Sequence, residues 1–185
     1  MDAPLHYGPL CEGKPAKSIE EVPLDWCYGP GVVIDCTHRK PAEYITKDDL
    51  IAGLKKISHT LKAGEVVLLR TDTSKHFDDP QFPNLNPGLH PDGTHWLLDQ
   101  GIRLIGIDAW GLDRPPRAMA EDHKKGIPNA LWPTHLVGRD REYLQIERLA
   151  NLDALPPTGF TVVAFPVKIE QGTAGWSRVV ALLPD

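Results

Sequence analysis

Three short apolar segments, separated by two segments with helical periodicity, constrain the fold of this chain more than any other feature. Their β-branched residues predict buried strands, at GVVIDC (31–36), GEVVLLRT (64–71) and IRLIGID (102–108). Between the first two strands, ITKDDLIAGLKKI predicts a helix that begins after a Thr46 cap. Between the second and third, PDGTHWLLDQG predicts a shorter helix from Asp92 to a Gly101 cap. Strands that alternate with helices in this way are typical of an α/β fold.

The rest of the chain adds antiparallel pairing to this pattern. Near the carboxyl end, FTVVAFPVKIEQGTAGWSRVVALL predicts two strands joined by a turn that contains glycine. Residues 10–30 are rich in Pro, Gly and charge and predict a long loop with room for one helical turn. Residues 111–133 form an insertion punctuated by prolines, and residues 141–155 fit either a helix or a strand followed by a turn. We therefore expect one α/β domain over residues 1–185, built on a mixed sheet.

Composition excludes several classes of protein. The net charge of −5 leaves no basic stripe that could neutralise a nucleic-acid backbone. Cys11, Cys27 and Cys36 are odd in number and follow no metal-binding spacing, which predicts buried thiols in a reducing compartment. No apolar run reaches the roughly 18 residues that span a bilayer, and the start does not resemble a signal peptide. These features predict a cytoplasmic protein.

The opening stretch, MDAPLHYGP, carries unusual chemistry for a chain terminus. Termini are usually poorly ordered and tolerate change, yet here Asp2, Pro4 and His6 alternate. In an extended segment all three side chains would point to one side. A loop aspartate beside a surface histidine explains the same residues equally well. The alternative is that Asp2 and His6 belong to a site.

Two other histidine groups are weaker candidates. His135 and Glu147 form a separated pair, and most such pairs are unrelated in function. His90 and His95 lie five residues apart, which does not place them on one helix face, so we expect both to be structural or exposed to solvent. Together, Asp, Glu and His are the ligand set of Zn²⁺ or Mn²⁺. The sequence contains neither a phosphate-binding glycine loop nor a Gly-x-Ser-x-Gly elbow.

The opening stretch resembles the second half of the motif His-x-Gly-Thr-His-x-Asp-x-Pro-x-His. This motif marks the cyclase family of metal-dependent hydrolases, to which bacterial kynurenine formamidase and isatin hydrolase belong. Asp2, Pro4 and His6 match its last three defined positions, and the two earlier histidines are absent. Further similar segments follow in family order: GVVIDC, ITKDDL, GEVVLLRT, GIRLIGID, QIERLANLDAL, VVAFPVKI and GTAGWSRVVAL. The resemblance therefore extends along most of the chain.

The resemblance implies a swivelling β/β/α fold and metal-assisted hydrolysis of a C–N amide bond. It implies that Asp2 bridges two divalent ions, Zn²⁺ or Mn²⁺, and that His135 and Glu147 hold the second ion. His6 would move the proton. His123 competes with His135 for the ligand position, and the spacing to Glu147 favours His135.

The same resemblance implies a small-molecule amide substrate, an aryl formamide such as N-formylkynurenine or a cyclic amide, and a homodimer or higher homo-oligomer. A polyketide-tailoring cyclase of the family and a non-catalytic truncated homologue are the alternatives. Because the family's first metal site takes two histidines upstream of Asp2, we expect the start to be a truncation or a misplaced start codon. We expect residues 1–185 to bind at most one ion and to have little activity.

Overall fold

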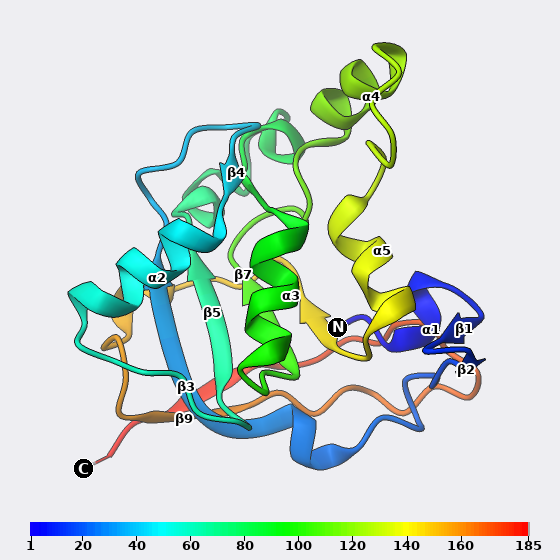
Figure 1. The fold of residues 1–185 in the computed structure, drawn as a ribbon. Helices are drawn as coiled ribbons and strands as arrows, with labels where there is room; N and C mark the ends of the chain where they lie inside the picture. The colour runs from blue at the N-terminus through cyan, green and yellow to red at the C-terminus, as the bar shows by residue number, and fades with distance from the viewer. Residues whose placement is uncertain (185) are drawn as a thin grey trace.

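A computed structural model describes residues 1–184, which form a six-stranded mixed sheet partly covered by helices (Figure 1). The strand order is β10-β9-β3-β5-β7-β8. Strands β3, β5, β7 and β8 run parallel, whereas β9 pairs antiparallel with β3 and β10 pairs antiparallel with β9. The bounds are β3 Tyr28–Asp35, β5 Val66–Arg70, β7 Leu104–Ile107, β8 Leu144–Ile146, β9 Phe160–Val163 and β10 Val180–Leu182. The predicted mixed α/β fold is confirmed.

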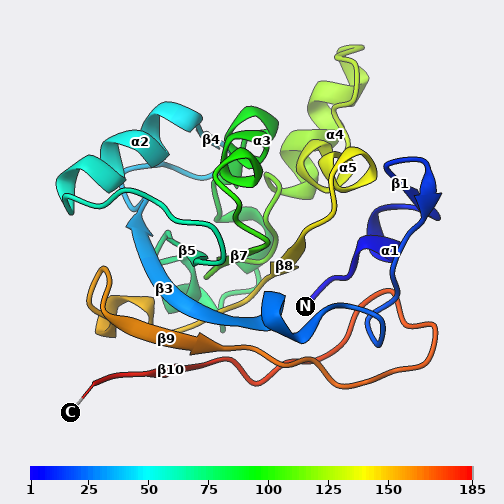
Figure 2. The same cartoon turned by 60° about the horizontal axis from the view of Figure 1, so that its bottom comes forward.

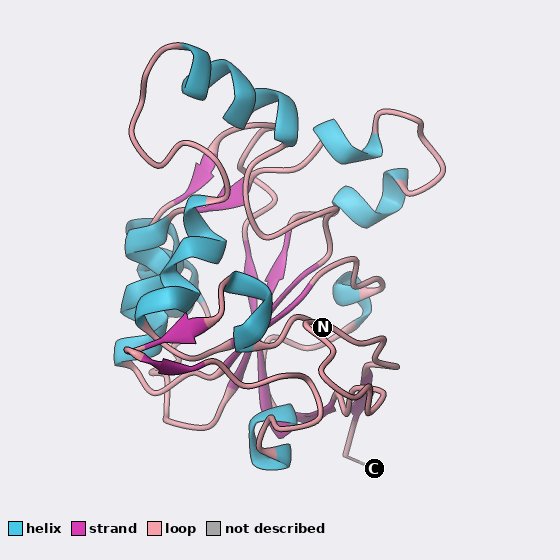
Figure 3. Cartoon of the chain, turned by 90° about the vertical axis from the view of Figure 1, so that its right-hand side faces the viewer, coloured by secondary structure: helices cyan, strands magenta, loops and turns pink. Residues whose placement is uncertain are grey.

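The helices and the minor strands surround this sheet. The helices are α1 Pro4–Tyr7, α2 Lys47–Lys56, α3 Pro91–Asp99, α4 Pro116–Lys124 and α5 Pro133–Asp140, with four short 3₁₀ turns at Leu24–Cys27, Thr73–His76, Phe82–Asn84 and Leu152–Ala154. Two small sheets pair β1 Leu10–Cys11 with β2 Lys14–Pro15, and β4 Tyr44–Ile45 with β6 Gly88–Leu89. Helices α2, α3 and α5 lie on one side of the main sheet (Figure 2), and Figure 3 shows that long loops connect the helices and strands.

The central strands are buried on both faces because their apolar residues alternate between two cores. In β5, Val67 and Leu69 join the core under α2 and α3, whereas Val66 and Leu68 join a second core on the opposite face. The second core is covered by residues 18–27 and 149–155 rather than by a long helix. This double burial explains why the parallel strands are near-continuous apolar runs in the sequence.

Helix α2 follows the predicted capping chemistry. The Thr46 side chain accepts a hydrogen bond from the Asp49 backbone N–H, and the Asp49 carboxylate accepts from the Thr46 backbone N–H. This reciprocal pair satisfies two backbone donors that the first turn leaves unpaired. The three cysteines are free and buried, as predicted. Within residues 1–184, no helix is both long enough and apolar enough to cross a membrane.

Three local predictions differ from the structure. Residues 4–7 form a helical turn rather than an extended segment, and proline at the first helical position favours that turn. Residues 10–30 contain a helical turn within the predicted loop, at Leu24–Cys27, but they also contain the short β1–β2 pair and the first three residues of β3. Strands β9 and β10 pair as predicted, but the sixteen residues 164–179 connect them, because the segment returns past Asp2 instead of turning tightly.

A close approach between α1 and α5 joins the start of the chain to its later part. At Gly138, in α5, an added Cβ would lie 1.9 Å from Tyr7 Cδ2, so only glycine permits this contact. The Tyr7 ring stacks on Tyr143 with ring centroids 4.9 Å apart. Tight packing of Tyr7 therefore fixes the position of the adjacent His6 relative to α5.

Candidate metal site

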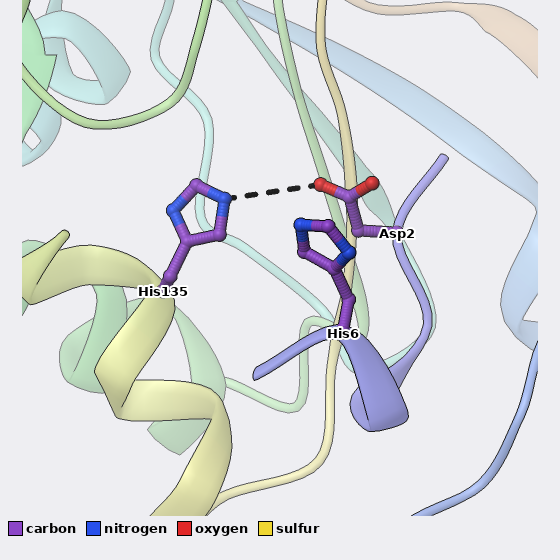
Figure 4. A group of neighbouring side chains, drawn as sticks. All are labelled: Asp2, His6 and His135. Carbon is purple, nitrogen blue, oxygen red and sulfur yellow. Dashed lines mark ion pairs between the residues drawn. The ribbon is translucent and has the colours of Figure 1, made fainter. Parts of the chain in front are cut away.

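Four side chains from three distant parts of the sequence meet beyond the carboxyl ends of β7 and β8. They are Asp2, His6, His135 and Glu147, which we call the site cluster. Donor atoms of Asp2, His6 and His135 all lie within 4.8 Å of one another (Figure 4). The His135 Nε2 atom lies 3.9 Å from Asp2 Oδ2 and 3.8 Å from Glu147 Oε1. The carboxyl edge of a parallel sheet is where open α/β folds place their ligands.

Asp2 is fixed by backbone pairing on both sides. Its N–H donates to the Gln145 carbonyl at 2.8 Å, and it forms single antiparallel bridges with Gln145 and Ala174. The Asp2 side chain is 14% exposed and faces His135. The helical turn that follows brings His6 back towards Asp2. It is this turn, and not the alternation of a strand, that places the two side chains together.

His135 is held in one orientation by Asp113, a residue that the sequence did not single out. The Asp113 carboxylate accepts the His135 Nδ1–H at 2.5 Å and the backbone N–H groups of Thr134 at 2.7 Å and His135 at 3.2 Å. It therefore caps α5 and orients the imidazole at the same time. Because Nδ1 carries this proton, the Nε2 lone pair is available on the side that faces Asp2 and Glu147.

The electrostatics of the cluster favour a cation. Burial alone would lower the pKa of His135, but the hydrogen bond and charge of Asp113, with Glu147 and Asp2, raise it. Burial, and then the nearby Asp2 carboxylate, raise the pKa of Glu147. Three carboxylates thus surround one imidazole. A divalent ion would balance this negative charge and would replace the second proton of His135.

The residues present fit a divalent metal ion. Two carboxylates and a neutral imidazole are the oxygen and nitrogen ligands that Zn²⁺ and Mn²⁺ take, and a neutral ring with a free Nε2 is the form that binds. Separations of 3.8 and 3.9 Å from Nε2 to the two carboxylate oxygens suit ligands that share one ion at about 2.0–2.2 Å each. Asp2, His135 and Glu147 could therefore hold an ion.

His6 differs from these three in its exposure. It is exposed to solvent, and its Nδ1 lies 3.3 Å from the Thr173 hydroxyl. It also lines a cavity of about 200 Å³ together with His135 and Glu147. The other residues that line this cavity are Trp110, Gly111, Asp113, Arg114, Pro116, Met119 and Trp132. An exposed imidazole that lines a cavity beside the other three side chains suits proton transfer to and from a molecule in that cavity.

The other histidines considered above lie outside the cluster. His123 is exposed on α4, which Figure 1 shows at the top of the molecule, apart from α1. His90 is the N-cap of α3, where its Nδ1 accepts from the Asp92 backbone N–H at 3.2 Å. His95 lies within α3. Among residues 1–184, the Asp2, His6 and His135 group is the one set of three metal-binding side chains at this spacing.

Two residues of the site were missed by sequence reasoning. Asp113 lies in the insertion 111–133. The one feature that points to it is indirect: Trp132, the residue before α5, cannot cap the helix with its side chain, so another residue must accept the first backbone N–H groups. Gln145 lies in β8, where Leu144 and Ile146 face the second core, so alternation turns Gln145 towards the site. Because residues 141–155 fit either a helix or a strand, the sequence pattern did not establish which side chains of this segment share a face. Neither residue type would have been distinguished without the tertiary contact.

Comparison with known proteins assigns the chain to a family. The family model described as "Putative cyclase" matches residues 1–114. An isatin hydrolase of Roseibium aggregatum is 34% identical over 203 aligned residues, which cover 100% of this chain and 70% of that protein. The chain belongs to the cyclase family. A kynurenine formamidase of Salinibacter ruber is 28% identical over 180 residues, which cover 97% of this chain and 72% of the relative.

Solved structures of cyclase-family proteins share the fold. An isatin hydrolase bound to the product analogue thioisatinate superposes with a TM-score of 0.81 at 30% identity, over 100% of this chain and 70% of that one. A structure described as a potential metal-dependent hydrolase with cyclase activity gives a TM-score of 0.61 at 28% identity, over 97% and 75%. The expected membership of the cyclase family is confirmed.

The role of Asp113 can be tested through metal binding. We expect Asp113→Asn to weaken the affinity for Zn²⁺ by about 10–100-fold, which is typical for loss of a partner that orients a ligand. The amide cannot accept all three hydrogen bonds, so the His135 ring loses its fixed tautomer and orientation. Isothermal titration calorimetry measures the change, with Asp99→Asn, at an exposed side chain in the last turn of α3, as the control. An affinity within twofold of the unaltered protein would contradict this role.

Proposed function

We propose that this cyclase-family chain is a metal-dependent hydrolase that cleaves the C–N bond of an aryl formamide or of a cyclic amide. The observation that carries the proposal is the convergence of Asp2, His135 and Glu147 beside the exposed His6. Both relatives described above are hydrolases by name, isatin hydrolase and kynurenine formamidase. Their names favour hydrolysis over a polyketide-tailoring cyclase or a non-catalytic homologue.

The site residues have distinct tasks in this reaction. Asp2, His135 and Glu147 would hold Zn²⁺ or Mn²⁺, which when bound lowers the pKa of a water molecule and polarises the substrate carbonyl. Nε2 of His6 accepts a proton from the attacking water and returns it to the departing nitrogen. The products are a carboxylic acid and an amine, which stay on one molecule when the amide is cyclic.

The cavity supports an aromatic substrate. Trp110, Trp132 and Met119 supply apolar lining, and the Arg148 guanidinium lies over the Trp110 ring, 3.8 Å from its centroid. Aromatic side chains provide large flat contacts for a planar ring. A volume of about 200 Å³ suits a small molecule rather than a polymer. We therefore propose N-formylkynurenine or isatin as the substrates to test first.

The proposal is tested by hydrolysis assays on the full protein that the gene encodes. We expect hydrolysis of N-formylkynurenine or isatin, loss of the rate on exhaustive chelation, and recovery of the rate with Zn²⁺ or Mn²⁺. The Asp99→Asn variant should behave like the unaltered protein in all three steps. Activity that persists after the metal content has fallen to background would refute a metal-dependent mechanism.

We also propose that the protein acts as a homodimer or a higher homo-oligomer. The support is a group of exposed apolar side chains on the 164–183 segment, including Phe165, Val167, Trp176 and Leu182. Trp176 is 86% exposed, which is high for so large an apolar side chain. Oligomerisation would bury this surface.

A further inference from the structure

The Gln145 side chain occupies the centre of the site cluster. It is fully buried, and its Nε2 atom lies 2.9 Å from Asp2 Oδ2, 2.7 Å from His135 Nε2 and 3.3 Å from Glu147 Oε1. One amide nitrogen thus contacts the three side chains that would hold a metal ion. An NH₂ group has two protons, so it can satisfy two of these acceptors at a time.

The oxygen of the Gln145 amide lies against the Tyr143 hydroxyl, whose single proton has two possible acceptors. The Tyr143 hydroxyl lies 3.1 Å from Gln145 Oε1 and 3.0 Å from the Thr134 carbonyl. Both are acceptors in the observed orientation, and one hydroxyl proton serves one of them. After a half-turn about Cγ–Cδ, the Gln145 NH₂ would donate to Tyr143, and Tyr143 would donate to Thr134. In the reversed orientation both the Thr134 carbonyl and the Tyr143 hydroxyl therefore accept a hydrogen bond.

The reversed orientation is unfavourable at the other end unless a cation is present. It would place Oε1 beside the Asp2 and Glu147 carboxylates and the Nε2 lone pair of His135, with no proton between them. A divalent ion among these atoms would reverse the sign of that interaction, because a carbonyl oxygen is itself a good ligand for hard or borderline ions. The preferred orientation of Gln145 thus depends on whether an ion is bound.

We propose that the Gln145 carboxamide is a metal-responsive element of this site. Without metal, its NH₂ group occupies the place between Asp2, His135 and Glu147 and keeps these three side chains close together by hydrogen bonding. With metal, the amide reverses and Oε1 becomes an additional ligand. This inference rests on the proposed function, since it requires that Asp2, His135 and Glu147 bind an ion.

Two substitutions separate this role from simple packing. Gln145→Glu removes the N–H donors and adds a carboxylate, so it should destabilise the metal-free protein yet tighten Zn²⁺ binding by roughly tenfold. Gln145→Met keeps the length and removes every hydrogen bond, so it should destabilise the metal-free protein and weaken Zn²⁺ binding by roughly tenfold. A residue that only fills space would shift the affinity in one direction for both variants, or in neither.

The experiment measures thermal unfolding without metal and Zn²⁺ affinity by calorimetry for both variants. Gln100→Met, at the end of α3 beside a different cavity, is the matched control. Zinc is diamagnetic, so the Gln145 side-chain NH₂ signals can also be followed by NMR. We expect these signals to shift on zinc addition, in the unaltered protein, as the partners change from the site acceptors to Tyr143.

The outcomes are distinguishable. Opposite changes in affinity, together with lower unfolding temperatures in the absence of metal, support the proposal. Zinc affinities within twofold of the unaltered protein in both variants overturn the ligand role while leaving the metal site intact. Failure of the unaltered protein to bind Zn²⁺ or Mn²⁺ overturns the metal site of the proposed function and this inference with it. If Gln145→Met does not fold, Gln145→Glu alone decides, because weaker or unchanged binding contradicts the proposal.

Discussion

His135→Ala is expected to empty the ion site that His135 forms with Asp2 and Glu147, and to reduce hydrolysis by the full protein to background. His135 is the one nitrogen ligand among Asp2, His135 and Glu147, and its Nε2 lies within 4 Å of both carboxylates. Its removal leaves Asp2 and Glu147, and catalytic zinc sites usually need three protein ligands. The metal content after dialysis, measured by elemental analysis, is the primary readout.

The control for this variant is His123→Ala, which removes a solvent-exposed imidazole from α4. It should retain the metal content and rate of the unaltered protein. Loss of metal from His123→Ala, with retention in His135→Ala, would reverse the assignment of the two histidines. Circular dichroism establishes that a metal-free His135→Ala protein is folded, so that loss of metal is not mistaken for loss of structure.

His6→Ala is expected to lower kcat by about 10²–10⁴-fold in the full protein, with its metal content unchanged. The His6 ring is exposed and has one side-chain hydrogen-bonding partner, Thr173, at 3.3 Å. It lines the cavity, with its ring centroid 5.7 Å from that of His135, which is the place that the proposed proton transfer requires. The substitution removes the proposed proton carrier and leaves the three proposed ligands in place.

Metal content decides how a slow His6→Ala enzyme is interpreted. A rate loss with full metal content supports proton transfer, whereas parallel loss of rate and metal would make His6 a ligand, since its donor atom also lies within 4.8 Å of those of Asp2 and His135. The control is His76→Ala, an exposed histidine at the end of a 3₁₀ turn. It should leave both quantities unchanged.

Periodicity and local capping were enough to predict most of the sheet. Strands β5 and β7 lie within the predicted apolar segments, β3 overlaps the predicted segment 31–36 but begins at Tyr28, and α2 begins after Thr46, the predicted cap. These elements depend on residues close in sequence. The family motif at Asp2 and His6, followed by similar segments in order, likewise depends on local sequence and was sufficient to predict the cyclase family.

Helix α5 shows why local reasoning failed elsewhere. The residue before it, Trp132, has a left-handed backbone conformation and no side-chain cap, so no local signal marks its start. The missing cap is supplied by Asp113, about twenty residues earlier, whose carboxylate accepts the first backbone N–H groups. The carboxylate that caps the helix also orients His135. One tertiary contact therefore decides both the element and the ligand geometry.

The sequence by itself determined the α/β class, the buried strands and the types of residue available for metal chemistry, because these follow from the order of neighbouring side chains. Only the tertiary structure decided which residues meet. The pairing of Asp2 with Gln145, the close approach of Tyr7 to Gly138 and the turn of α1 set the site geometry. The first two contacts join residues more than 130 positions apart, and their energies depend on packing that no local pattern encodes.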